Sequence, residues 1–457
     1  MEIGLLFWGF LIVYGFIMMV LSPKVESVGG FFMGHDKDGK SASPFMLTAS
    51  IFISWIFAKS VTNAANLGAT YGIVGGVAYA AYWLCIPLAG FAIYRLRTRY
   101  AAKGLVSFLT ENYGHGAAVA FSAAILIRLF NEVWSNTSVV GGYYGKSGSK
   151  EFIIAAVVFT LITLVYSMKG GLRSSIVTDT IQAIIFVVFV VWVVAIIMPH
   201  HTVGEMLTTG SWKIDAGVDM LLVSILQIFS YPFHDPVLTD RGFISEEKTM
   251  LKAFIVSGLL GFIAIVVFSF IGIHAKITGM AISDNVPADL GRTLGTGAYF
   301  LMIAVMVSAA GSTLDSTFSS LAKLTAYVLP RMTGRDLGDK SRKLGMLVMV
   351  IIALVGNLPM ILGTDILKAT TISGTMVIGL APVFLLHGLV RPTKIGFHLS
   401  FWIGIILGFA MTFNAIPAWF AIGTGKYAML LGVNLYGLIA CTLAYIVAGL
   451  VFGEKTS

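Results

Sequence analysis

The residues of this 457-residue chain best suited to chemistry are polar side chains set inside long apolar runs. The densest group follows Ala309 and contains Ser312, Thr313, Asp315 and Ser316. Hard cations such as sodium bind several oxygen atoms, by analogy with calcium and magnesium. The Ala309 carbonyl and the hydroxyls of Ser312 and Thr313 lie within one helical turn, so the pattern predicts a cation site. The alternative is close helix packing, with each hydroxyl bonded to a carbonyl one turn back.

A second group of polar residues surrounds Asp179, in the stretch GGLRSSIVTDTIQ that begins at Gly170. Two glycines and Arg173 lead into an apolar run, and the acid lies one to two turns inside it. A carboxylate at that depth is costly unless it has a partner. Asp179 could bind a cation, balance a buried lysine, or form a structural salt bridge.

Composition identifies the elements that must position these residues as membrane helices. Apolar types make up 57% of the chain and charged types 11%, and the mean hydropathy is +0.89. Soluble domains average about 45–50% apolar and about 25% charged residues. These values exclude a soluble enzyme, a disordered tail and a coiled coil. They predict an all-α membrane protein, because lipid cannot satisfy the hydrogen bonds of an open backbone.

Thirteen apolar runs are long enough to cross a bilayer. They fall near 3–21, 44–69, 72–94, 117–143, 151–168, 174–198, 217–238, 251–274, 297–329, 344–362, 365–390, 395–417 and 429–452. The first has Glu2 before it instead of a basic segment, so we expect a retained anchor.

Basic residues predict the orientation of these runs. With the N-terminus outside, 21 of the 30 Lys and Arg residues, Arg241 and Lys323 among them, fall in cytoplasmic segments and six fall outside. Cytoplasmic loops are typically rich in Lys and Arg. The net charge of +8 therefore indicates a multi-pass protein of the cytoplasmic (inner) membrane and no nucleic-acid partner. An odd number of spans places the C-terminus in the cytoplasm.

Two runs contain residues that interrupt a helix. Span 2 carries Lys59 within residues 54–60, and span 7 carries Pro232 and Pro236. They lie five spans apart, which predicts two five-span repeats, 44–198 and 217–390, inverted in the membrane. Residues 1–43 then form an extra span with a loop, and 391–457 two further spans. Matching interruptions in two halves are typical of a transporter's midplane site, whereas single proline kinks are common in membrane helices.

The stretch from Gly170 to Gln182 resembles the signature of the sodium:solute symporter family, and Ala309-x-x-Ser312-Thr313-x-Asp315-Ser316 resembles that family's second signature. The resemblance implies the LeuT-type fold, with 13 transmembrane helices and broken helices at spans 2 and 7. It also implies a Na⁺ site made by carbonyls near Trp55 and Ala58 together with Ala309, Ser312 and Thr313. A second cation, or charge balance, would involve Asp179, Asp315 and Ser316.

Lys59 departs from the family pattern, because it follows the presumed carbonyl ligand Ala58 directly. Its ammonium could replace the cation and make transport independent of sodium. It could instead pair with Asp179 or Asp315, contact an anionic solute, or snorkel towards the interface.

Solute contacts are predicted on three further segments. Arg128, Asn131, Glu132, Ser135 and Asn136 share one helical face, and Arg128 and Glu132 are spaced for an ion pair. Gln227 and Tyr231 are candidates at the span-7 break, where His234 and Asp235 could carry a proton. Thr371 is a candidate for closing the cavity. A purely structural ion pair and ordinary helix packing are the alternatives.

Together these residues predict a secondary active transporter, not an enzyme, that couples Na⁺ to a small polar solute by alternating access. Buried Arg128 and Lys59 suggest a carboxylate-bearing solute, although ion pairing within the protein explains them equally well. The alternatives are a proton-coupled or ion-independent transporter of the same fold and a membrane sensor that binds solute without moving it. No organic cofactor is expected.

Overall fold

The computed structural model describes residues 2–362 and 366–453, and their regular secondary structure is helical. Besides α6 (Cys85–Tyr100), eight helices of the described ranges are 16 residues or longer: α1 (Glu2–Leu21), α8 (His115–Gly142), α9 (Lys150–Ile197), α13 (Glu247–Ile277), α15 (Thr296–Lys323), α17 (Lys340–Val355), α20 (Lys394–Thr412) and α21 (Ala428–Phe452). A further continuous helical stretch is α5 (Ile73–Ala80), η1 (Ala81–Leu84) and α6 (Cys85–Tyr100).

The remaining elements are shorter. Two interrupted segments are α3 (Pro44–Ser54) with α4 (Ala58–Tyr71), and α11 (Val218–Gln227) with η4 (Tyr231–His234), α12 (Pro236–Thr239) and η5 (Asp240–Phe243). The others are α2 (Val28–Met33), α7 (Leu105–Tyr113), η2 (Met198–His200), α10 (Val203–Leu207), η3 (Ile214–Ala216), α14 (Val286–Leu294), η6 (Leu324–Val328), α16 (Leu329–Met332), η7 (Leu358–Leu362), α18 (Ile366–Met376), α19 (Leu380–Leu385) and η8 (Ala418–Phe420).

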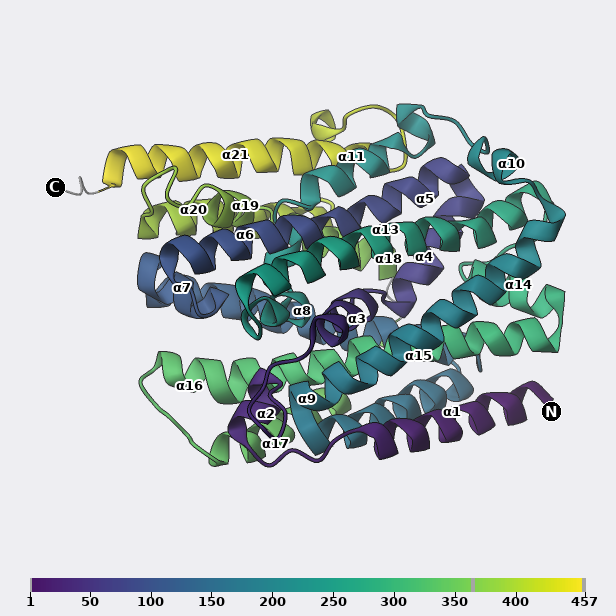
Figure 1. Ribbon diagram of the computed structural model, residues 1–457. Coiled ribbons are helices and arrows are strands. Elements are labelled where there is room, and N and C mark those ends of the chain that lie inside the picture. The colour runs from purple at the N-terminus through teal and green to yellow at the C-terminus, as the bar shows by residue number, and fades with distance from the viewer. Residues whose placement is uncertain (1, 363–365, 454–457) are drawn as a thin grey trace.

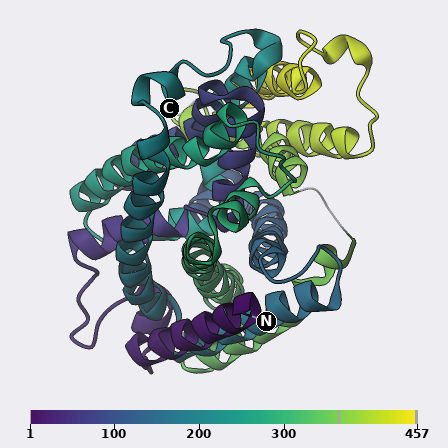
Figure 2. The ribbon, with the colours of Figure 1, turned by 90° about the vertical axis from the view of Figure 1, so that its right-hand side faces the viewer.

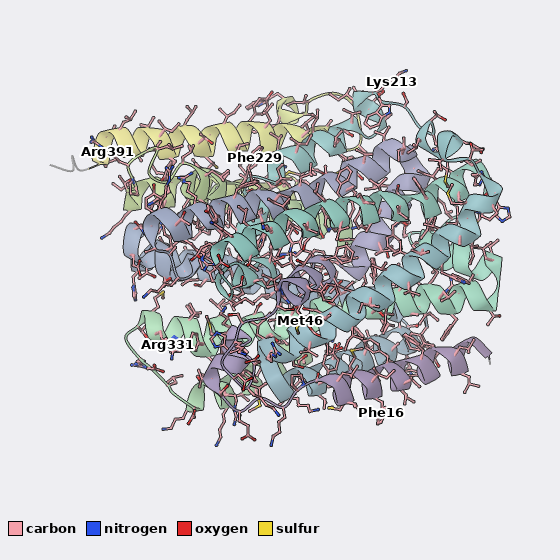
Figure 3. The ribbon with its side chains drawn as sticks, viewed as in Figure 1. Phe16, Met46, Lys213, Phe229, Arg331 and Arg391 are labelled. Atoms are coloured by element: carbon pink, nitrogen blue, oxygen red, sulfur yellow. The ribbon has the colours of Figure 1, made fainter. Side chains whose placement is uncertain are left out.

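Nine of the helices in the described ranges are long and apolar enough to cross a membrane, or ten if the bent pair α3 and α4 is one span. Their outer surfaces carry exposed apolar side chains, as expected of surfaces that face lipid. Phe16 on α1, for example, is 70% exposed (Figure 3). The multi-pass membrane class predicted from composition is confirmed. The count of thirteen stays a prediction, although each of the thirteen runs contains helix where the structure describes it.

Helix α9 contains both the fifth and the sixth predicted runs. The backbone of Gly171 is not helical, with φ 55° and ψ −135°. The Ser174 hydroxyl reaches the carbonyl of Tyr166, eight positions earlier, at 3.2 Å, whereas a straight helix would separate these positions by about 12 Å. The chain therefore folds back sharply at Gly171, and the two halves of α9 are separate rods.

The long helices run side by side along the horizontal direction of Figure 1. Helix α13 packs on α3, α4, α5 and α6, and α15 packs on α8 and α9. The C-terminal pair, α20 and α21, lies at the edge of the bundle (Figure 2). Arg331 and Arg391, both predicted to be cytoplasmic, lie towards one end of the rods, and Lys213, predicted to be outside, lies towards the other (Figure 3).

Candidate transport site

The first element of the candidate site is the break between α3 and α4, where the chain bends by 56°. Trp55 and Phe57 leave the helical path, Phe57 with an extended backbone of φ −66° and ψ 143°. The freed backbone N–H of Ala58 donates to the Asn136 side-chain oxygen on α8 at 3.1 Å. Asn136, predicted to contact solute, therefore holds the break open.

Oxygen atoms of the predicted cation site meet at this break. The Thr313 hydroxyl donates to the Ala309 carbonyl one turn back at 3.1 Å, the bond expected of ordinary helix packing, and it also lies 3.5 Å from the Ser54 carbonyl, across from α15 to α3. Ser54 directly precedes Trp55, so the carbonyl that Thr313 contacts comes one position before the predicted one. Ser312 is buried and donates to an Asp179 oxygen at 2.5 Å.

Four buried charges form a second part of the site, which we call the charge tetrad: Lys59, Arg128, Glu132 and Asp235. Lys59 lies 2.6 Å from Glu132, and Arg128 lies 2.9 Å from Asp235. Arg128 also pairs with Glu132 within α8, as their spacing predicts. Each side chain is at most 2% exposed. The tetrad joins α4, α8 and the second break, and its two positive and two negative charges cancel.

The tetrad excludes two of the alternatives left open for Lys59, an ion pair with Asp179 or Asp315 and a side chain that reaches the interface. Its ammonium contacts Glu132 and the Ser135 hydroxyl, the latter at 3.1 Å, so it pairs with neither Asp179 nor Asp315. Asn131 is only half-buried, and its oxygen accepts from the indole N–H of Trp134 on the same helix. The predicted polar face of α8 therefore divides, with Asn131 set apart from the buried residues.

A separate buried cluster surrounds Asp179. The Arg241 guanidinium donates to the Asp179 carboxylate at 2.8 Å, to the Ser316 hydroxyl at 2.8 Å and to the Ser50 hydroxyl at 2.7 Å. Arg241, which was assigned to the cytoplasmic side, is not a solvated loop residue, because its side chain is 0% exposed. The polar residues around Arg241 in the sequence are typical of a loop, and they do not indicate that its partner is Asp179, 62 positions earlier.

Asp315 adds a second carboxylate to this cluster. It accepts from the Thr178 hydroxyl at 2.8 Å and lies beside Ser316. Asp179, Asp315 and Arg241 are all fully buried, and they carry two negative charges against one positive charge. When both carboxylates are ionised, the cluster is one positive charge short of neutrality, and its oxygen atoms are of the hard type that Na⁺ prefers.

The second break separates α11 from α12 and contains Pro232 in η4. At its start, Gln227 accepts from the Tyr82 hydroxyl at 2.7 Å and donates to the Thr371 carbonyl and the Asn434 oxygen, each at 3.0 Å. The predicted residues Gln227 and Thr371 are thus adjacent. Gln227 also ties the break to the last helix, α21, a contact that no local pattern announces.

A cavity of about 550 Å³ is lined by residues next to the tetrad and by Arg331, which lies towards one end of the bundle in Figure 3. Its walls include Ile125, one turn before Arg128, and Pro236, next to Asp235. Lys323 and Asp240, 3.0 Å apart, form an ion pair on its wall. Lys323, which was counted on the cytoplasmic side, is only 6% exposed, so its charge is buried in this ion pair.

The fold is that of a class of helical membrane transporters. A solved structure of a Na⁺-coupled sialic acid symporter, substrate-bound and outward-open, superposes with a TM-score of 0.75 at 13% identity, over 100% of this chain and 99% of that one. Mhp1, a nucleobase-cation-symport-1 family transporter, gives a TM-score of 0.57 at 14% identity, over 93% and 94%. These likenesses support the predicted LeuT-type fold.

The family resemblance predicted from the motifs is confirmed. A sequence model of the sodium:solute symporter family matches residues 37–238. The urea active transporter of Saccharomyces cerevisiae is 21% identical over 394 residues, covering 74% of this chain and 52% of that protein. Sodium/glucose cotransporter 1 of Oryctolagus cuniculus is 24% identical over 187 residues, covering 39% and 28%. The chain thus matches about half the length of the yeast relative, and these relatives are transporters rather than enzymes.

Proposed function

We propose that this protein is a secondary active transporter that moves a small polar solute together with Na⁺ by alternating access. Na⁺ binds between the Ser54 carbonyl at the first break and the Ala309 and Thr313 oxygens of α15. Solute binds between the two breaks, facing the tetrad. The protein lies in the cytoplasmic membrane with 13 spans, ten of which form two inverted five-span repeats, and has its N-terminus outside and its C-terminus in the cytoplasm.

The observation that carries this proposal is the meeting of α15 oxygens with a helix break, beside a buried cluster that lacks one positive charge. Ser312 links the helix break to the cluster, because its hydroxyl donates to Asp179 and it directly precedes Thr313 in α15. A cation bound there would offset the excess charge, since an unbalanced carboxylate is expensive inside a membrane. The 550 Å³ cavity, lined by Ile125, Pro236 and Arg331, is the route that we propose for solute towards the cytoplasmic end.

Binding of Na⁺ can be tested without knowing the solute. We expect NaCl to raise the melting temperature of the purified protein more than KCl at equal ionic strength. Thr313→Val keeps the shape of the side chain but removes an oxygen. It should raise the Na⁺ concentration for half-maximal stabilisation about tenfold, equivalent to about 1.4 kcal/mol.

Thr313→Ser is the matched control, because it keeps the hydroxyl, and its Na⁺ response should stay within a factor of about three of the unmodified protein (roughly 0.6 kcal/mol). Equal responses to NaCl and KCl in the unmodified protein, or an unchanged response in Thr313→Val, would refute the Na⁺ site. Uptake into proteoliposomes that depends on a proton gradient but not on Na⁺ would favour the proton-coupled alternative.

A further inference from the structure

The two helix breaks and α8 contribute side chains to a buried cluster, which we call the aromatic box: Trp55, Phe57, Tyr231 and the Arg128 guanidinium. The Trp55 ring lies 5.6 Å from that of Phe57 and 6.0 Å from that of Tyr231. The guanidinium carbon of Arg128 lies 5.4 Å from the Phe57 ring and 5.2 Å from the Tyr231 ring. Trp55 and Arg128 thus each contact both the Phe57 ring and the Tyr231 ring, so the four groups form a closed ring of contacts.

Two hydrogen-bond donors of this box have no acceptor. In the part of the chain that the structure describes, Trp55 Nε1 and Arg128 Nε are buried and make no hydrogen bond. A buried donor without a partner is unfavourable and calls for an explanation such as a ligand. The Nη1 and Nη2 atoms of Arg128 contact Glu132 and Asp235. A solute that brings an acceptor oxygen into the box could accept hydrogen bonds from these two N–H groups.

Trp83 shows that an unpaired indole is not enough by itself. Its Nε1 also lacks a partner, but a methyl group added at Gly261 would come within 2.8 Å of that atom. The N–H edge of Trp83 therefore packs against α13. This position explains the missing hydrogen bond by close helix contact and makes Trp83 a matched control for Trp55.

The charge of the solute follows from the charges around the box. The tetrad is neutral, so it offers no spare positive charge to a carboxylate, although Arg128 and Lys59 seen alone suggest one. With both of its carboxylates ionised, the neighbouring cluster of Asp179, Asp315 and Arg241 lacks one positive charge, which one monovalent cation would supply. A charged solute would leave the buried site unbalanced in either sign.

Two other buried ionic groups do not change this count. Lys323 and Asp240 neutralise each other. Asp219 lies in the first turn of α11, where the backbone N–H groups of Met220 and Tyr427 donate to it at 2.8 and 2.7 Å. A helix N-terminus favours a negative charge, so Asp219 is stabilised locally.

We propose that the box selects an uncharged polar solute with a carbonyl-type acceptor oxygen, and that one monovalent cation accompanies each molecule. The oxygen accepts from Trp55 Nε1 and Arg128 Nε, and the rings of Phe57 and Tyr231 cover its planar group. Each cycle then carries one net positive charge across the membrane. The inference rests on the proposed transport function, whose cation it takes to be Na⁺.

Isosteric probe pairs separate charge from shape. We would measure thermal stabilisation of the purified protein by urea and guanidinium, acetamide and acetate, and nicotinamide and nicotinate, in saturating NaCl. The uncharged member of each pair should stabilise at a concentration at least about tenfold lower than its charged partner. Trp55→Phe keeps the ring and removes the N–H, and should weaken the response to uncharged probes about tenfold. Trp83→Phe should leave the response unchanged.

Membrane potential tests the charge count directly. Proteoliposomes would be given a sodium gradient and an inside-negative potential set with potassium and valinomycin, and uptake of the strongest uncharged probe measured. The potential should accelerate uptake several-fold. Sodium-driven uptake that ignores the potential would overturn the proposal, and so would equal or stronger binding of the charged probes, or no response to any uncharged probe.

These outcomes are distinct from failure of the proposed function. If Na⁺ neither stabilises the protein nor drives uptake, the Na⁺ coupling fails. The order of the isosteric pairs, measured in sodium-free buffer, still decides whether the box accepts an uncharged solute. If Na⁺ stabilises the protein while acetate and nicotinate bind best, the Na⁺ site stands and the solute inference falls.

Discussion

Glu132 is the residue on which the tetrad depends, because it faces both Lys59 and Arg128. Removing one member of a buried ion pair is costly, since the other charge remains without compensation. We predict that Glu132→Gln lowers the free energy of unfolding by about 3–5 kcal/mol. The amide retains the shape of the side chain, so denaturation followed in detergent would report the loss of charge.

The double variant Lys59→Met with Glu132→Gln separates charge balance from local packing. It removes one charge of each sign and leaves Arg128 with Asp235. We therefore expect it to be more stable than Glu132→Gln alone, which is a large favourable coupling in a double-mutant cycle. Simple addition of two single losses would show that the four charges do not act as one network.

How much could be predicted at this scale depended on sequence distance. Arg128 and Glu132 are four positions apart, so helical geometry alone predicted their ion pair. Lys59 and Glu132 are 73 positions apart, and Arg241 and Asp179 are 62 apart, so only the packing of helices selects these pairs. A lone arginine after a proline-containing run has the same local pattern as a loop arginine, so the burial of Arg241 could not be predicted from its neighbours.

Among the elements, the reversal inside α9 makes the sharpest structural demand. Gly171 has a positive φ, and a Cβ at this position would lie 2.4 Å from the Phe31 carbonyl of α2. We predict that Gly171→Ala destabilises the protein by about 1–3 kcal/mol or more, because strain and overlap act together. Thermal unfolding measures the loss, and limited proteolysis around α2 should show that this helix undocks.

Gly9→Ala on α1 is the control for that substitution. A Cβ at Gly9 would contact no atom within 4 Å, and Gly9 lies within a regular helix. Alanine should be neutral or slightly stabilising there, since it has the higher helix propensity. Equal melting temperatures for Gly171→Ala and the unmodified protein would contradict the reversal at Gly171.

The contact between α21 and the second break is the next demand at this scale. Asn434 accepts from Gln227 and donates to Thr375, each at 3.0 Å. Asn434→Leu would leave both partners buried with one hydrogen bond fewer, at a cost of about 1–3 kcal/mol each. We predict a lower melting temperature and a higher solute concentration for half-maximal uptake, measured in proteoliposomes. Unchanged values for both would mean that α21 does not position the break.

The sequence located the interrupted elements better than it explained them. Pro232 predicted a break in span 7 by ordinary backbone chemistry, because proline removes a donor and clashes with the preceding turn. The break after Ser54 has no proline or glycine, and only Lys59 drew attention to it. Its conformation depends on Asn136 from α8, so no local pattern could have given it.

For the whole molecule, composition was sufficient to predict the membrane-protein class. A chain with 57% apolar residues has more apolar surface than its own core can bury, so lipid must cover the rest. Orientation depends on fewer residues. Arg241 and Lys323 are buried. Without these two, 19 basic residues are still assigned to the cytoplasmic side against six on the outside. The positive-inside rule therefore still predicts that the Arg331 end faces the cytoplasm.

Cysteine labelling can decide this orientation, because the two native cysteines, Cys85 and Cys441, are each 0% exposed and should react little. Lys213→Cys and Arg331→Cys place single reactive thiols at opposite ends of the rods (Figure 3). In intact cells, a membrane-impermeant maleimide should label Lys213→Cys, and it should label Arg331→Cys only after permeabilisation. The unmodified protein gives the background. The reverse pattern would invert the topology and place the 550 Å³ cavity at the outer face, where solute would enter through it.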